Sequence, residues 1–210
     1  MRKRHLGGAV LVLAASLALT SCSDSAKVGA AFTAGSARMS ESELTSLIDE
    51  SRKAQTDLGV EVSAAVDIAS GALNAHIWQE IVNVAAAARK VTVTKTELSD
   101  ILNAEYSRSG KKNVQGQLAS IGYPPRMAED YARLVLLQNK VSQDVAGGKS
   151  DATAQAAVAK FWSDTATTLK ITVAPRYGTW DASALQVTPA QNPNTNSDPN
   201  GGNNGGNQAP

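Results

Sequence analysis

Apolar residues recur every three or four positions along most of the stretch 40–169, which is the spacing of one face of an α-helix. The pattern predicts helices that begin near Ser40, Ser63, Thr94, Asn113, Pro124 and Asp151. Two of these starts are capping boxes, in which a hydroxyl residue is followed by Glu three positions later: Ser40 with Glu43 and Thr94 with Glu97. Glycines follow three of the predicted helices and mark their ends: Gly59, Gly122 and Gly147.

Two of the predicted helices carry long apolar faces that should meet in one core. On the helix expected over 63–88 the face consists of Leu73, Ile77, Ile81, Val84 and Ala88. On the helix that starts at Pro124 it consists of Met127, Tyr131, Leu134, Val135, Gln138, Val141 and Val145. We expect Trp162 and Trp180 to anchor this core, whereas Trp78 could lie either in the core or in a binding groove.

Two short segments at either end of the helical stretch have an extended character. Residues 26–38 contain Val28, Phe32 and Gly35, and residues 170–173 alternate with a period of two. Because the segments bracket the helices, their pairing would bring the start and the end of the domain into one small sheet. The sequence therefore predicts a mostly α fold, a multi-helix domain with a small β element formed by its N- and C-terminal segments.

The first 22 residues have the organisation of a lipoprotein signal peptide. Three basic residues at 2–4 precede an apolar run over 6–19, which is too short for a permanent membrane span. The run ends in Leu19-Thr20-Ser21-Cys22, which resembles the lipobox of bacterial lipoproteins. We expect cleavage between Ser21 and Cys22, lipidation of Cys22, and attachment to the extracytoplasmic face of the cell membrane.

Composition divides the rest of the chain into three parts. Residues 22–26 should be a linker from the lipid anchor, and 27–186 the folded domain. Residues 187–210 are rich in Asn, Gly and Pro and carry one charge, so they cannot bury enough apolar area to offset their chain entropy. We expect this segment to be a disordered tail.

The charge pattern gives no reason to expect nucleic acid as a partner. The formal charge of +1 falls to −2 when residues 1–21 are removed, because they hold three basic residues and no acidic one. The pairs Arg89-Lys90 and Lys111-Lys112 are isolated and are typical of solvated helix faces.

No constellation of residues points to catalysis, so we expect no catalytic residue, no metal site, no cofactor and no enzymatic activity. With His5 in the signal peptide, His76 is the one histidine of the mature chain, and we expect it to serve packing or to lie on the surface. The acid pairs Glu41 with Glu43 and Asp49 with Glu50 fit helix capping and a solvated face. A single cysteine excludes an intramolecular disulfide and leaves too few ligands for a zinc site.

Three stretches resemble the SurA N-terminal domain family, especially its short actinobacterial lipoproteins. Residues 28–44 look like the family's opening strand pair and first helix, residues 91–98 like the start of its third helix, and residues 171–181 like its closing strand. The closing segment carries Ala174 before Pro175, where family members usually have Asn or Ser, and the opening stretch 30–35 is less turn-like than theirs. The likeness covers most of 28–181 and includes no parvulin domain, because only a short linker occupies 146–151.

The resemblance implies an ATP-independent chaperone, a holdase or foldase whose partners are unfolded or partly folded exported polypeptides. The residues that would contact such clients are not indicated by the sequence. The alternative is a lipoprotein scaffold or binding module dedicated to one partner in the cell envelope. Suppression of aggregation of several unrelated proteins would favour the chaperone, and capture of a single partner would favour the scaffold.

Overall fold

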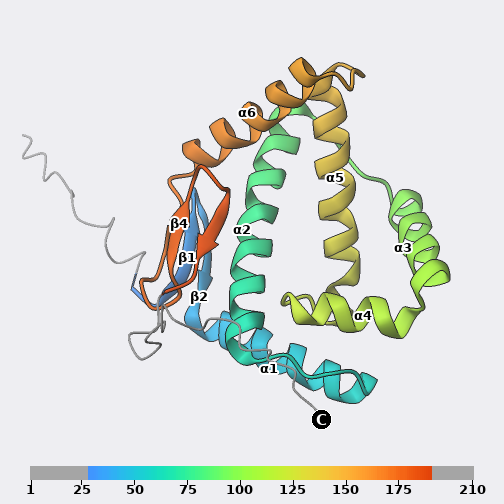
Figure 1. The fold of residues 1–210 in the computed structure, drawn as a ribbon, viewed down its shortest axis with the longest axis vertical. Coiled ribbons are helices and arrows are strands. Elements are labelled where there is room, and N and C mark those ends of the chain that lie inside the picture. Colours follow the sequence, from blue (N-terminus) through green and yellow to red (C-terminus); the bar gives the residue numbers. More distant parts are fainter. Residues whose placement is uncertain (1–27, 191–210) are drawn as a thin grey trace, which may run out of the picture.

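The computed structural model describes residues 28–190, which form a mostly helical domain with two small antiparallel sheets (Figure 1). The helices are α1 (Glu41–Leu58), α2 (Ala65–Arg89), α3 (Lys95–Ser109), α4 (Lys111–Ser120), the 3-10 turn η1 (Pro125–Met127), α5 (Ala128–Ala146) and α6 (Ala152–Thr168). The strands are β1 (Ala30–Ala34), β2 (Ala37–Ser40), β3 (Thr172–Val173), β4 (Thr179–Asp181) and β5 (Gln186–Thr188). This confirms the predicted mostly α class and the order of the helices.

The helix starts follow the capping chemistry that the sequence predicts. The Ser40 side chain accepts a hydrogen bond from the Glu43 backbone N–H at 3.1 Å, and the Glu43 carboxylate accepts one from the Ser40 N–H at 2.6 Å. Thr94 and Glu97 form the same reciprocal pair at α3. Each pair satisfies backbone donors that have no partner within the helix, so these starts are determined locally.

Helix α2 is the centre of the domain, and α1, α4, α5 and α6 all pack against it (Figure 1). The prediction for its buried face is correct for Leu73, Ile77 and Ile81 and wrong beyond them. Val84 is 41% exposed and Ala88 is also exposed, while Val82 and other residues on a different side are buried. The buried face moves round the helix because its neighbours change: α1 lies at the start of α2 (Figure 1), whereas Trp78 and Arg89, in its second half, contact α5 and α6.

The expected pairing of the two ends of the domain is confirmed. β1 is the middle strand of a three-stranded sheet, with β2 on one side and β3 on the other, both antiparallel. Phe32 lies opposite Val173 and Thr33 opposite Thr172, and the hydroxyls of the two threonines are 2.7 Å apart. A strand close to the C-terminal end of the domain thus completes a sheet begun at its N-terminal end.

The predicted boundary between the domain and the tail at 186/187 is wrong by a few residues. β4 and β5 form a second antiparallel hairpin that lies against α2. Val187 is 3% exposed, and its N–H donates to Asn74 Oδ1 at 2.6 Å. One buried valine between polar residues leaves too little pattern for a strand to be predicted. The rest of the predicted tail, from 191, and the predicted signal peptide, Cys22 and linker lie outside the described residues.

Candidate functional site

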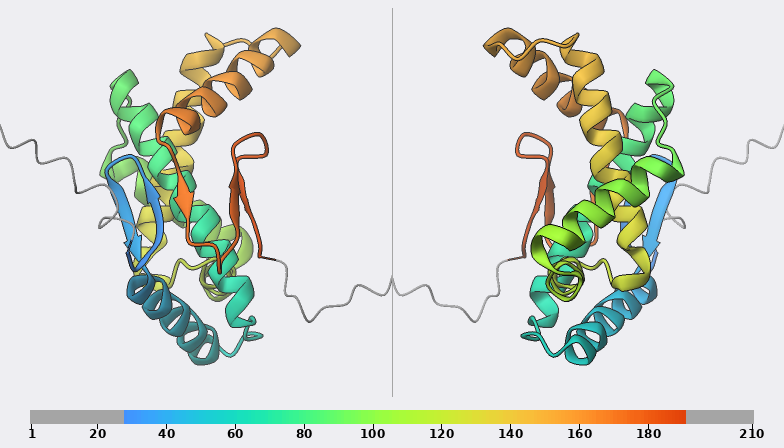
Figure 2. Two further views of the ribbon diagram at one scale, coloured as in Figure 1. Left: turned by 90° about the vertical axis from the view of Figure 1, so that its left-hand side faces the viewer. Right: turned by 90° about the vertical axis from the view of Figure 1, so that its right-hand side faces the viewer.

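Helices α3 and α4 form an arm on one side of the domain (Figures 1 and 2). Helix α3 packs on α5, whereas α4 packs on α1 and also contacts α2. Leu98 is the only fully buried residue of α3. The apolar side chains that follow it on α3, Ile101 and Leu102, are half-exposed. The arm therefore presents an apolar helix face that its neighbours do not cover completely.

A groove of about 290 Å³ lies where α3, α4 and α5 converge. We call it the arm groove, and its lining consists of Ile101, Leu102, Glu105, Val114, Gln117, Leu118, Tyr131, Ala132 and Val135. All but two of these side chains are apolar. The floor of the groove is formed by Val114, Leu118 and Ala132, which are buried in the core. The lining residues of α3, in contrast, are half-exposed.

The polar groups of the arm groove are few and do not form a reactive pair. Glu105 makes an ion pair with Arg108 one turn along α3. Gln117 is an uncharged amide that can donate and accept hydrogen bonds with a backbone. A groove with this lining can bury one or two apolar side chains, and its amide can hydrogen-bond to the main chain that carries them.

The base of the arm is held by an aromatic cluster on the loop between α4 and α5. Tyr123 is fully buried, stacks on His76 at 4.8 Å between ring centroids, and meets the edge of Tyr131 at 5.2 Å. Its hydroxyl donates to Gln79 Oε1 at 2.8 Å. Burial raises the pKa of the Tyr123 phenol, so it stays protonated and donates this bond. The cluster fixes the loop, and with it the start of α5, on α2.

His76 is a packing residue in this cluster. Burial lowers the pKa of its imidazole below the ordinary 6.5, so the ring is neutral at physiological pH. Its Nε2 has no hydrogen-bond partner among the described residues and is closed off from solvent. The ring therefore contributes to stacking against Tyr123, as the sequence led us to expect of a histidine without catalytic neighbours.

A second cavity, of about 390 Å³, lies beside β2, α1 and η1 and is lined in part by charged side chains. Arg126 binds both carboxylate oxygens of Glu50, at 2.6 and 2.8 Å, and Glu43 is engaged in its capping box. The side chain of Arg38 donates to the Val28 carbonyl at 2.9 Å. Because the charges of this cavity are largely compensated within the domain, the arm groove is the stronger candidate.

The three tryptophans pack together or against the core and do not line the arm groove. Trp162 is 5% exposed, and Trp180 is half-buried against the core. This agrees with the prediction for both residues. Trp78, whose place the sequence left open, lies 5.0 Å from the Trp162 ring, and its Nε1 donates to Gln138 Oε1 at 3.0 Å. Trp78 therefore joins α2 to α5 and α6.

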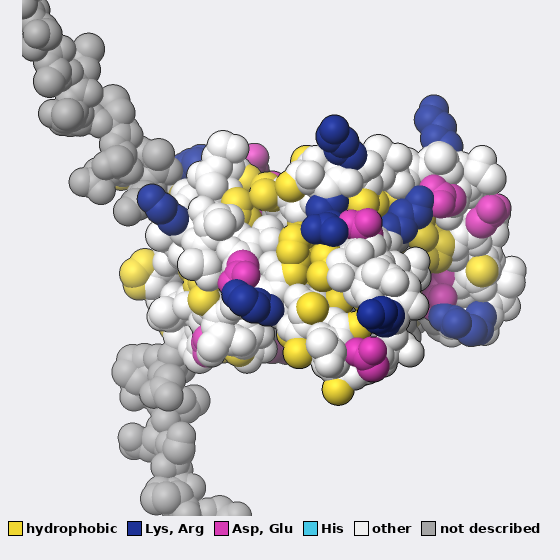
Figure 3. Space-filling view, turned by 90° about the horizontal axis from the view of Figure 1, so that it is seen from above, with side chains coloured by type: hydrophobic (Ala, Val, Ile, Leu, Met, Phe, Trp, Pro, Cys, Tyr) yellow, Lys and Arg dark blue, Asp and Glu magenta, His cyan; other side chains and the backbone are white. Residues whose placement is uncertain are grey.

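The acidic residues that the sequence singled out do not meet. Glu41 pairs with Arg176 at 2.5 Å, Glu50 with Arg126, and Glu43 with its N-cap serine. Over residues 28–190 no cluster of three or more potential metal ligands is found. Seen from above, basic and acidic side chains are mixed among apolar ones (Figure 3). Arg89 and Asp144 form an ion pair that joins α2 to α5.

Among the described helices, none combines the length and the hydrophobicity needed to cross a bilayer. The predicted lipidation site Cys22 and the predicted cleavage site Ser21–Cys22 lie outside the described residues. Comparison with known proteins identifies no relative: no protein-family model matches the chain, and no curated protein or solved structure is detectably similar to it.

Proposed function

We propose that this protein is a lipid-anchored, extracytoplasmic chaperone that shields apolar segments of unfolded exported polypeptides in the arm groove, without ATP. The observation that carries the proposal is the groove itself, an apolar and partly open surface in which α3, with one buried residue, forms the half-exposed wall. The resemblance of 28–44, 91–98 and 171–181 to the SurA N-terminal domain family, and the lipobox at Cys22, support the same function.

The size of the arm groove suits weak and reversible binding. Transfer of one aliphatic side chain from water into an apolar site contributes about 1.5–3 kcal/mol, and one or two such chains fit. Each 1.4 kcal/mol changes the affinity tenfold, so a single occupied site gives weak binding and rapid release. A client with several apolar segments would rebind repeatedly, which suppresses aggregation but does not trap the client.

The test is light scattering during dilution of chemically unfolded citrate synthase and rhodanese, which are unrelated to each other. The double variant Ile101→Gln/Val135→Gln places polar groups on two walls of the arm groove. The matched control is Val66→Gln, the same change on a valine of α2 that is 69% exposed and does not line the groove. Circular dichroism establishes that the variants remain folded.

We expect the parent protein and Val66→Gln to suppress scattering of both clients, and the double variant to lose most of this activity. Equal activity of all three proteins would refute the assignment to the arm groove. If neither client is protected and crosslinking in cells captures a single envelope protein, the groove serves a dedicated partner, and the scaffold function replaces the chaperone.

The anchor is tested separately by mass spectrometry of the protein extracted from cell membranes. We expect the mature chain to begin at Cys22 and to carry the mass of a diacylglycerol group, which stabilises membrane attachment by about 0.8 kcal/mol per buried methylene. The variant Cys22→Ser should accumulate uncleaved or leave the membrane. An unmodified Cys22 in the mature chain would rule out the anchor.

A further inference from the structure

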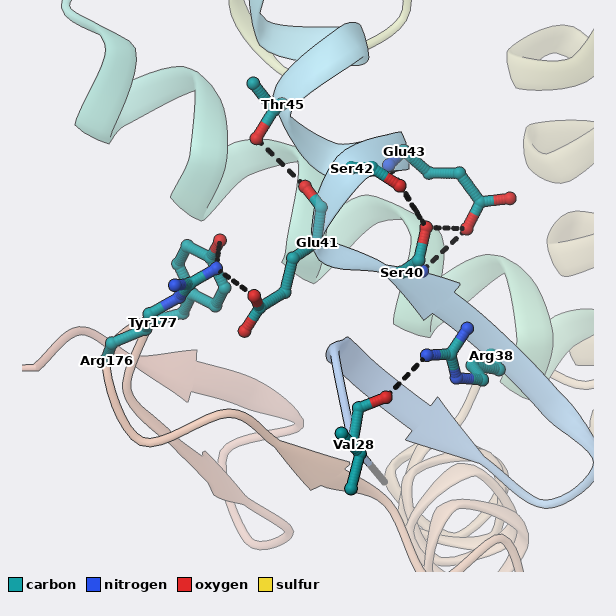
Figure 4. Close-up of polar contacts among 9 residues, drawn as sticks. All are labelled: Val28, Arg38, Ser40, Glu41, Ser42, Glu43, Thr45, Arg176 and Tyr177. Atoms are coloured by element: carbon teal, nitrogen blue, oxygen red, sulfur yellow. Dashed lines mark hydrogen bonds and ion pairs between the residues drawn. The ribbon is translucent and has the colours of Figure 1, made fainter. Parts of the chain in front are cut away.

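The N-terminal end of the described chain is bound firmly to the domain. The Val28 carbonyl accepts a hydrogen bond from Arg38 at 2.9 Å (Figure 4). The Gly29 carbonyl accepts one from the Glu41 N–H at 2.9 Å. Ala30 is then paired with Ser40 across β1 and β2. The point at which the chain enters the domain is therefore fixed relative to the sheet, and residues after 28 add nothing to the reach of a tether.

The C-terminal end of the described chain is on the same side of the molecule. Arg176, between β3 and β4, makes its ion pair with Glu41 at the start of α1 (Figure 4). Gly178 lies directly against the end of β5, where an added Cβ would come within 2.1 Å of the Thr188 carbonyl oxygen. We call this side, formed by β1–β3 and the β4–β5 hairpin, the sheet side. It lies across α2 and α5 from the arm (Figures 1 and 2).

The chain between Cys22 and Val28 is short compared with the domain. Six peptide units separate the two Cα atoms and span at most about 20 Å when fully extended. A domain of this length has a radius of gyration of about 15 Å and is roughly 40 Å across. A lipid on Cys22 can therefore hold the sheet side near the bilayer, but the tether is too short for the opposite side of the domain to reach the bilayer.

We propose that the sheet side faces the membrane that holds the lipid anchor, and that the arm groove opens away from it. This inference rests on the lipid anchor of the proposed function, and the occupant of the surface is the lipid headgroup region itself. The orientation leaves the groove open to polypeptides that approach from the extracytoplasmic space. It also places Val28, which is 76% exposed, next to the headgroups.

The charges on the sheet side indicate that the tether, and not electrostatic attraction, sets the orientation. Glu41 neutralises Arg176, whose guanidinium also lies over the Tyr177 ring at 4.7 Å. Such a mixed surface gains little from an anionic bilayer, in contrast to a run of basic residues. The orientation should therefore be the same on neutral and anionic vesicles.

The test uses the full acylated protein in vesicles of phosphatidylcholine, alone or with an equal part of phosphatidylglycerol. Cys22 is the only cysteine of the chain and is blocked by its lipid, so one introduced cysteine can carry a fluorescent donor. Three exposed positions report height: Ala190→Cys on the sheet side, Glu61→Cys between α1 and α2, and Ser107→Cys on α3. Energy transfer to acceptor-labelled headgroups is measured for each.

We expect transfer to be highest from position 190 and to fall several-fold at position 107, with position 61 between them, on both kinds of vesicle. Insertion of about twenty Gly and Ser residues after Ala26, with a mean span of about 25 Å, should remove most of the difference. Equal transfer from positions 190 and 107 with the native tether would overturn the orientation. Cys22→Ser should show no transfer at any of the three positions. If the acylated protein also shows none, the anchor is refuted and the orientation with it.

Discussion

Gly122 is the position where a single methyl group should disturb the junction between the arm and the body. Its φ of +79° lies in the region that favours glycine, and it sits beside Tyr123, which anchors the loop on α2. A Cβ at this position would lie 2.4 Å from the Cβ and 2.9 Å from the Cα of Ala72. Since Ala72 belongs to the buried face of α2, the helix backbone would have to move.

The cost of Gly122→Ala has two parts. A left-handed backbone conformation costs an L-residue about 1–2 kcal/mol. The overlap with Ala72 is an overpacking of the core, which typically costs about 1–3 kcal/mol. Gly147→Ala separates the two, because Gly147 also has positive φ, +60°, but has nothing within 4 Å of its Cβ position. We expect a loss of about 3 kcal/mol at Gly122 and of about 1 kcal/mol at Gly147.

Urea denaturation followed by circular dichroism measures both variants in a Cys22→Ser background. The expected difference of about 2 kcal/mol corresponds to a fall of about 4–8 °C in Tm for a domain of this size. The double variant Gly122→Ala/Gly147→Ala should lose the sum of the two, because the sites are independent. If Gly122→Ala is no more destabilising than Gly147→Ala, the close approach of the loop to α2 is refuted.

Three further predictions address other parts of the core. Burial lowers the pKa of His76 in the native state, so the unfolded chain binds the proton first as the pH falls below 6.5. The free energy of unfolding should therefore be highest above pH 6.5 and decline by up to about 1.4 kcal/mol per pH unit below it. His76→Gln should remove this slope in urea titrations between pH 5 and 7. Ser40→Ala should cost about 1 kcal/mol by loss of the N-cap of α1, whereas Ser46→Ala, at an exposed position of the same helix, should cost little, as measured by urea midpoints. Trp162→Ala should cost about 3–5 kcal/mol in thermal unfolding, because it empties the space between α2, α5 and α6; a loss below 1 kcal/mol would contradict its place in the core.

The sequence was sufficient for those parts of the fold that obey local rules. Ser40 and Thr94 start their helices through side-chain hydrogen bonds to residues three positions away, and Gly59 ends α1 in a left-handed conformation. The pairing of β1 with β3 is a long-range contact, yet it was predictable. The sequence has one segment of extended character before the helices and one after them. The backbone N–H and C=O groups of each segment need hydrogen-bond partners, and the other segment can supply them.

The parts that were not predicted depend on which neighbour covers which face. The buried face of α2 moves from one side to another along the helix, so no single stripe describes it, and Val84 faces solvent. The arm groove is formed by residues such as Ile101 and Val135, whose helical spacing is the same as that of core residues. Their partial exposure arises because α3 packs mainly on α4 and α5, a tertiary fact without a local signature.

The contacts of α3 bear on how the wall of the arm groove would accommodate the clients that we propose for it. On α3, Leu98 is buried, and Leu102 and Tyr106 pack against the core while partly exposed. Glu97 adds an ion pair with Lys140 of α5 at 2.6 Å, and Lys140 also donates to the Thr92 carbonyl at 2.9 Å. The Lys140 ammonium and the Thr94 backbone lower the pKa of Glu97 to about 2, so the pair stays charged at physiological pH. Breaking a partly exposed ion pair costs little free energy, because water replaces the lost contact. Separating buried apolar side chains costs more, so polar contacts of this kind allow a helix to shift more readily.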